Sequence, residues 1–284
     1  MGKINLIWQT LEGDQTSFEL EYITEVLFSK VDHEKFFDSG SFRTVLDNSV
    51  IIYSSIRGYV SQEFLSYLNQ FVEKNYTFYL LHLSNERPED PCKHYSLAKH
   101  VFRNYYSPEM EKENVTFIPL GFKSGFLNKD KEVLECSEKS ISVCFIGQPK
   151  SDRNELIQVL EKIDSSFVHK TNSWNCPTSL SPQECIEIYK KSKYAPCPMG
   201  WIHPDSFRIS ESLEWGCVPI IKRHNGEDYF QHIFPGHPMP VVSSWEEVEL
   251  VVKEEYCSLR NKVQEWYLRY IEDLKEKIKN KLEQ

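Results

Sequence analysis

The sequence predicts an α/β protein of two domains, each built around a parallel β-sheet. The first observation is length, because 284 residues suffice for two domains of about 140 residues each. The second is composition, since 40% hydrophobic and 26% charged residues are typical of a soluble globular chain. The third is pattern: short apolar runs alternate with amphipathic helical stretches in two successive series. Such alternation favours parallel strands joined by helices.

The first series occupies residues 1–125 and ends at a polar segment. A buried strand is expected at 4–8, followed by a polar loop and an amphipathic helix over 18–29. The later elements of this domain are expected as strands at 50–53, 77–83, 100–105 and 115–120 and a helix at 62–73. Residues 126–140 are polar and poor in apolar side chains, which predicts an interdomain linker.

The second series occupies residues 141–258. Its strands are expected at 143–147, 167–170, 194–197, 218–221 and 239–242, and its helices at 154–162, at 183–191 and from 206 onward. Residues 259–284 predict a long C-terminal helix with charged faces.

The net charge and the absence of several motifs exclude some classes of function. The chain has 33 basic and 42 acidic residues, a net charge of −9, which argues against a nucleic-acid partner. The sequence lacks the motifs of dinucleotide oxidoreductases, P-loop ATPases, serine hydrolases and zinc sites. It also has no D-x-D pair of the kind that holds a metal-bound nucleotide diphosphate, so we expect no metal and no cofactor.

Apolar runs and cysteines indicate the cellular location of the protein. No apolar run is long enough for a signal peptide or a membrane span, which predicts a soluble, cytoplasmic protein without a transmembrane segment. Eight cysteines occur without a C-x-x-C pair, and several lie in apolar strand-like contexts. We therefore expect reduced, buried thiols.

The most informative stretch is 197–221, with the sequence CPMGWIHPDSFRISESLEWGCVPII. Prolines and a glycine interrupt regular structure between 198 and 204, after an apolar strand-like run. Asp205 and Ser206 then form a good N-cap pair for a short helix, and Gly216 stands where a C-cap glycine belongs. The stretch predicts strand, loop, helix and strand in succession.

The predicted helix has two different faces. Ile209 and Leu213 share one face, whereas Arg208 and Glu211 lie on the other. A helix start with a Ser206 hydroxyl and an arginine suits a diphosphate, and a carboxylate one turn later suits the paired hydroxyls of a ribose. This arrangement favours a nucleotide site. The alternative is an ordinary crossover helix with a surface ion pair between Arg208 and Glu211.

The segment D-S-F-R-I-S-E-S-L-E-W-G-C-V-P-I-I at 205–221 resembles the donor-binding segment of the exostosin-type glycosyltransferases. S-K-Y-A-P-C-P-M-G at 192–200, V-C-F-I-G-Q-P-K-S-D-R at 143–153 and V-T-F-I-P-L-G-F at 115–122 are similar to further parts of that family. The resemblance covers about half of the chain. It implies the GT-B fold, in which two Rossmann-like domains face each other and a C-terminal helix crosses back onto the first domain.

The resemblance also implies the donor-binding residues. They would be Arg153, Asp205, Ser206, Phe207, Arg208 and Glu211. Arg153 follows the strand at 143–147 by a short loop, at the edge where doubly wound sheets bind ligands. Its alternative role is that of a solvated arginine at a helix start. Trp174 could stack on the nucleotide base or serve as a core tryptophan.

The implied activity is transfer of a sugar from a UDP-sugar to a hydroxyl of a glycan or glycoprotein acceptor. Retaining enzymes of this fold commonly show E-x7-E ending at the position of Glu211, but residue 203 is histidine, which favours inversion. Arginine in place of a metal would neutralise the diphosphate, with Arg208 as a catalytic group. UDP-xylose and UDP-glucuronate are the leading donors. The alternatives are a retaining transferase, a nucleotide-sugar epimerase, and an inactive partner subunit that binds sugar nucleotides.

A general base is expected from the first domain, in a loop after a strand. The eligible side chains are Glu12, Asp14, His82, Glu86 and Asp90. We favour Asp14 as the catalytic base, because its loop follows the first strand beside a glycine; a turn aspartate or helix cap is the alternative. Arg57 and Glu86 are further candidates for contact with the acceptor.

Overall fold

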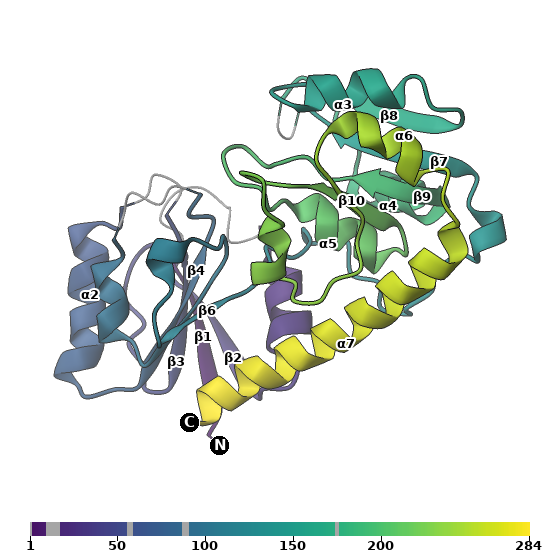
Figure 1. Cartoon of the computed structure of the whole chain (residues 1–284). Helices are drawn as coiled ribbons and strands as arrows, with labels where there is room; N and C mark the ends of the chain where they lie inside the picture. Colours follow the sequence, from purple (N-terminus) through teal and green to yellow (C-terminus); the bar gives the residue numbers. More distant parts are fainter. Residues whose placement is uncertain (1, 10–17, 56–58, 87–90, 174–175) are drawn as a thin grey trace. The chain divides into compact units, whose positions relative to one another are not determined.

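The computed structural model describes residues 2–9, 18–55, 59–86, 91–173 and 176–284. The chain forms two compact units (Figure 1). The first comprises Met1–Leu120, Trp201–His203 and Ile271–Gln284, and the second comprises Gly121–Gly200 and Pro204–Tyr270. The C-terminal helix therefore contributes its beginning to the second unit and its end to the first.

The first unit is built on a parallel sheet with the strand order β2-β1-β3-β4-β5-β6. Its strands are β1 (Ile4–Gln9), β2 (His33–Phe37), β3 (Ser49–Ser54), β4 (Phe78–Leu83), β5 (His100–Arg103) and β6 (Val115–Phe117). The side chains of β3 and β4 are all buried, as expected for strands covered on both faces. The chain order reverses between β1 and β3, which makes this pair the switch point of the sheet.

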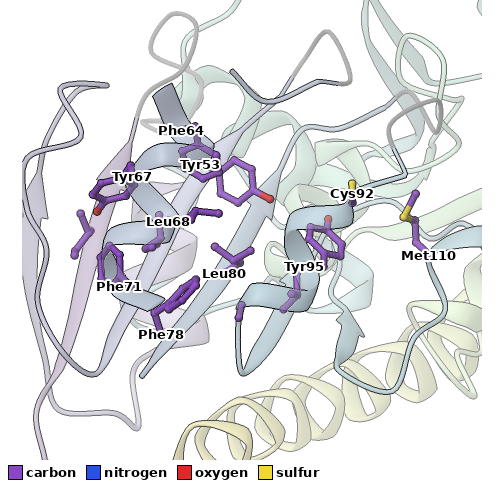
Figure 2. Packing of buried hydrophobic residues seen from close by; sticks show 14 residues of the cluster. Tyr53, Phe64, Tyr67, Leu68, Phe71, Phe78, Leu80, Cys92, Tyr95 and Met110 are labelled. Atoms are coloured by element: carbon purple, nitrogen blue, oxygen red, sulfur yellow. The ribbon is translucent and has the colours of Figure 1, made fainter. Parts of the chain in front are cut away.

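Helix α2 (Gln62–Glu73) covers one face of this sheet (Figure 2). The Ser61 hydroxyl caps it by accepting the Phe64 N–H at 3.2 Å. Its buried residues pack against Tyr53, Phe78 and Leu80 of the sheet in one apolar cluster. Other helical elements described in this unit are the π-helix η1 (Tyr22–Leu27) and the 3₁₀ turns η2 (Lys93–Leu97) and η3 (Pro108–Met110).

The second unit is built on a parallel sheet with the order β11-β10-β9-β7-β8. Its strands are β7 (Ile141–Gly147), β8 (Ser166–Lys170), β9 (Ser192–Pro196), β10 (Val218–Lys222) and β11 (Val241–Val242). Its helical elements are α3 (Arg153–Leu160), α4 (Pro182–Lys191), α5 (Phe207–Glu214), α6 (Val248–Val251), η4 (Cys136–Glu138), η5 (Tyr229–His232) and η6 (Trp245–Glu247), with α7 (Tyr256–Glu283) at the end. The switch point of this sheet lies between β7 and β9.

The prediction of an α/β chain with two parallel sheets and a C-terminal helix is confirmed. Strand β2 was not predicted, and the helix expected over 18–29 includes the π-helix η1. Residues 126–140, predicted as a linker, pack inside the second unit: the Asn128 N–H donates to Glu214 at 3.0 Å, and the Lys139 ammonium donates to the Gly216 carbonyl at 2.8 Å. In the described part of the chain, no helix combines the length and apolar character needed to span a membrane.

Candidate nucleotide-sugar site

The candidate site lies at the carboxyl edge of the second sheet. Strand β7 ends at Gly147, β9 ends at Pro196, and α5 connects the loop after β9 to β10. Open parallel sheets bind ligands outside the carboxyl ends of their strands, at the point where the strand order reverses. The order reverses between β7 and β9 here. The sequence and the topology thus select the same place.

Ser206 is the N-cap residue of α5, as predicted, but its side chain does not cap the helix. Its backbone is extended, with φ −150° and ψ 151°, and no capping hydrogen bond forms. The residue is 5% exposed, and its hydroxyl has no hydrogen-bond partner among the described residues. A buried hydroxyl without a partner costs free energy, and a bound acceptor would remove that cost. The hydroxyl is therefore available to a ligand at the start of the helix.

Arg208 lies across the end of strand β7. Its Nε–H donates to the Ile146 carbonyl at 3.0 Å, and its guanidinium lies 5.5 Å from the centroid of the Phe145 ring. A Cβ atom placed on Gly147 would come within 2.5 Å of Arg208 Nη2, so a larger residue at that position would displace the guanidinium. The terminal Nη groups have no hydrogen-bond partner within the part of the chain described. They can bind an anion while Nε holds the side chain in place.

Glu211 is buried, with 4% exposure. Its Oε1 atom has no hydrogen-bond partner among the described residues and lies 3.8 Å from Lys123 Nζ. Burial raises the pKa of Glu211 above its ordinary value, although Lys123, Arg208 and a hydrogen bond from Tyr189 act in the opposite direction. The surface ion pair considered from the sequence is absent: no Arg208–Glu211 salt bridge forms among the described residues. One carboxylate oxygen is left for hydroxyl donors.

Arg153 is the first residue of α3 and is 6% exposed. Its Nη2 group donates to the carbonyls of Met199 and Gly200, each at 2.7 Å, and Nη1 donates to Gln148 at 3.4 Å. The side chain is therefore not the solvated arginine of the alternative interpretation. It ties the loop after β7 to the loop after β9, the two loops that border the switch point.

Asp205 and Phe207 flank the N-cap. Asp205 is 2% exposed, and its charge adds to the burial that raises the pKa of Tyr270 in α7. The Tyr270 hydroxyl donates to the Ile233 carbonyl at 2.8 Å. Asp205 thus lies toward the α7 side of the second unit, and Phe207 is half-buried.

The acceptor-side predictions fall in the first unit. The Glu86 carboxylate accepts backbone N–H groups from Ile202 at 2.8 Å and from His203 at 3.3 Å, all within that unit. Five residues considered from the sequence lie outside the described residues: Glu12, Asp14, Arg57, Asp90 and Trp174. Among the described residues, no three His, Cys, Asp or Glu side chains are grouped so that they could hold a metal ion.

Sequence reasoning missed several residues that shape this site. Gly147 and Phe145 support Arg208, and the signal for them was the apolar run ending in glycine just before the expected loop. Lys123 and Tyr189 surround Glu211. No local pattern could have found those two, because they come from separate segments that only the fold brings to α5.

No protein-family model matches the chain, and no curated protein matches it by sequence. Solved structures are similar in fold. Anabaena Alr3699/HepE in complex with UDP has a TM-score of 0.58 at 11% identity, with 99% of this chain and 100% of that chain covered. The UDP-glucose complex of the same protein has a TM-score of 0.60 at 10% identity, with 98% and 99% covered.

An α1,3-fucosyltransferase has a TM-score of 0.52 at 10% identity, covering 100% of this chain and 91% of that chain. At such low identity the likeness concerns the fold alone. The chain has the GT-B fold, in the form of two α/β units with parallel sheets and a C-terminal helix.

Proposed function

We propose that the chain is an inverting, metal-independent glycosyltransferase of exostosin type, which moves a sugar from a UDP-sugar to a hydroxyl of a glycan acceptor. One observation carries the proposal. Helix α5 starts at the switch point with three polar groups that have unused binding capacity: the Ser206 hydroxyl, the Arg208 Nη groups and Glu211 Oε1. Buried polar groups without partners are rare in folded proteins and call for a ligand.

The three groups match the parts of a nucleoside diphosphate. The start of α5 and the Ser206 hydroxyl would donate to phosphate oxygens, because helix N-termini favour anions. Arg208 would bind the same diphosphate through its Nη groups and stabilise the negative charge that develops as UDP leaves. Glu211 would accept hydrogen bonds from the ribose hydroxyls one helical turn further on.

Arg153 acts in this proposal as a positioning residue. Its donors are used on the carbonyls of Gln148, Met199 and Gly200, so it holds the loops that border the diphosphate. Arg208 would then supply most of the positive charge beside the diphosphate, which supports stabilisation of the leaving group without a metal. The proposed base remains Asp14.

The comparisons support a uridine nucleotide as the donor. Alr3699/HepE shares the fold over nearly all of both chains and has been solved with UDP and with UDP-glucose. The donor sugar is a finer proposal: UDP-xylose and UDP-glucuronate follow from the exostosin resemblance. Inversion follows from His203 at the place of the first glutamate of the retaining pattern.

The test begins with binding. Saturation-transfer NMR should show binding of UDP and of a panel containing UDP-glucose, UDP-xylose and UDP-glucuronate, with ADP and GDP as controls. Arg208→Ala should abolish most of the signal. A wild-type chain that binds no uridine nucleotide would contradict the proposal.

Transfer is tested separately, by following UDP release and the anomeric configuration of the product. An inverted product supports the proposed mechanism, whereas a retained product would assign the chain to the retaining class. Tight UDP binding without any transfer or donor hydrolysis would instead identify a partner subunit that binds sugar nucleotides.

A further inference from the structure

A row of polar side chains crosses the first sheet near the carboxyl ends of its strands. The register pairs Gln9 of β1 with Tyr53 of β3, Tyr53 with His82 of β4, and His82 with Arg103 of β5. Paired residues of neighbouring strands point to the same face of a sheet. Each of the four is at most 2% exposed. This buried row crosses the switch point of the first sheet, the place where parallel sheets bind ligands.

A series of hydrogen bonds connects Arg103 through Tyr95 and His82 to Ser55. Arg103 Nη1 donates to the Tyr95 hydroxyl at 3.2 Å, that hydroxyl lies 2.6 Å from His82 Nδ1, and His82 Nε2 lies 2.6 Å from Ser55 Oγ. All four residues are buried. Two of these three distances are at the short end for hydrogen bonds, so the chain fixes its members closely.

The Ser55 hydroxyl keeps hydrogen-bond capacity beyond its contact with His82. A guanidinium can only donate, so the Tyr95 oxygen accepts from Arg103, whereas toward His82 Nδ1 a phenol can donate or accept. Where His82 Nε2 carries the hydrogen, it donates to Ser55 and leaves the hydroxyl hydrogen for a ligand. Where Ser55 donates to Nε2, the lone pairs of its oxygen can accept from a ligand hydroxyl.

His82 remains neutral in this arrangement. Burial is the main cause that holds its pKa well below the ordinary value, and the charges of Arg103 and His94 act in the same direction. Both of its ring nitrogens are also occupied. His82, one of the base candidates from the sequence, is thus poorly suited to accept a proton and well suited to orient Ser55.

Gln9 supplies an acceptor on the same face. Its Nε2 group donates to Asp38 Oδ2 at 2.7 Å, while its Oε1 atom is buried and has no hydrogen-bond partner among the described residues. Asp38 accepts from Gln9 and Thr44, and Arg103 is held through Nε on the Asn104 carbonyl and through Nη1 on the Tyr95 hydroxyl. The Ser55 hydroxyl and the Gln9 amide oxygen are two neutral groups with hydrogen-bond capacity on one face of the sheet. Neutral groups of this kind match the hydroxyls of a sugar.

We propose that the Arg103–Tyr95–His82 chain orients Ser55, and that Ser55 and Gln9 bind an uncharged, hydroxyl-rich sugar at the carboxyl edge of the first unit. The inference rests on the proposed function, in which this sugar is part of the glycan acceptor. His82, Tyr95 and Arg103 are positioning residues here, whereas Ser55 and Gln9 contact the sugar.

The test uses the full chain and neutral methyl glycosides of glucose, galactose and xylose as probes. Saturation-transfer NMR should show that at least one of them binds the wild type. Ser55→Ala should weaken that binding about five- to tenfold, the effect of one neutral hydrogen bond. Ser54→Ala is the matched control, because Ser54 is the neighbouring buried serine on the opposite face and should leave glycoside binding unchanged.

A second pair of variants tests the positioning role. His82→Phe and His94→Phe each remove a buried histidine that is hydrogen-bonded to a hydroxyl, but only His82 leads to Ser55. His82→Phe should weaken glycoside binding by the same factor as Ser55→Ala, and combining the two changes should add little. His94→Phe should affect stability alone. Circular dichroism melting verifies that each variant is folded.

The outcomes separate this inference from the function on which it rests. UDP binding depends on the second unit and should be unchanged in Ser55→Ala. A wild type that binds UDP but none of the glycosides, or a Ser55→Ala variant with wild-type glycoside affinity, would overturn the inference alone. A wild type without UDP binding would overturn the proposed function.

Discussion

The Glu211→Gln variant offers the sharpest test of the nucleotide assignment. Glu211 has one carboxylate oxygen without a hydrogen-bond partner among the described residues, so we expect about one charge-assisted hydrogen bond from the ribose. Such a bond contributes about 1.5 to 3 kcal/mol, which corresponds to a loss of about 10- to 150-fold in UDP affinity when glutamine replaces the carboxylate. Calorimetric titration with UDP measures this loss directly.

The ligand provides the matched control for this variant. 2′,3′-Dideoxy-UDP lacks both ribose hydroxyls, so its affinity should be nearly the same for the wild type and for Glu211→Gln. The four titrations form a double-mutant cycle between the carboxylate and the hydroxyls. If Glu211→Gln weakens both ligands by the same factor, the carboxylate does not bind the ribose, and the reasoning from its unpaired oxygen is refuted.

The pH dependence of the same titration has a defined sign. Burial raises the pKa of Glu211, so its carboxylate takes up a proton at a higher pH than an exposed glutamate would. If ribose hydroxyls bind the ionised form, UDP affinity of the wild type should fall as the pH is lowered through that raised pKa. The Glu211→Gln protein should lack this component.

Four further predictions concern the diphosphate and the base. Arg208→Ala should lower kcat about 10²- to 10³-fold, and Arg208→Lys should restore little, because an ammonium cannot form the bidentate contact of a guanidinium. Steady-state kinetics with a fixed acceptor measure both variants, and a wild-type kcat in Arg208→Ala would exclude a catalytic role of Arg208. Gly147→Ala should weaken UDP binding, because its Cβ would lie 2.5 Å from Arg208 Nη2; an unchanged calorimetric affinity would show that the guanidinium position is not needed. EDTA should leave UDP affinity unchanged, and loss of most affinity would disprove metal independence. Asp14→Asn should reduce kcat by about 10²-fold or more with UDP affinity retained, whereas near-normal turnover would move the base to another carboxylate.

Local signals in the sequence were sufficient to predict α5 and the strands on either side of it. Ser206 and Gly216 mark the two ends of that helix, and Gly216 has the positive φ of 68° that suits a residue after a helix end. Strand β2 was harder to predict, because its sequence HEKFF is charged and lies at the sheet edge, where β1 is its one partner among the described strands. Edge strands need little apolar character, so hydrophobic pattern gives weak evidence for them.

Long-range contacts account for what the sequence could not predict at the two sites. Lys123 and Tyr189 interact with the buried Glu211 from separate segments, and the row from Gln9 to Arg103 exists only through the pairing of four strands. His82 was a base candidate because of its place near the end of an expected strand of the first domain. Its partners change that interpretation, and they become visible only when the strand register and the position of η2 are known.

The two ends of helix α5 differ in their side-chain hydrogen bonds. At the end, the Glu214 carboxylate accepts from the Asn128 N–H, Lys131 and Tyr267, whereas Ser206 at the start leaves its hydroxyl unused. Local opening is easiest where contacts are few, so amide hydrogens near Glu214 should exchange slowly with or without nucleotide. Amides in the first turn should become slower to exchange only when UDP is present. In such a helix, the hydrogen bonds to Glu214 hold one end, and a bound nucleotide would add hydrogen bonds at the other.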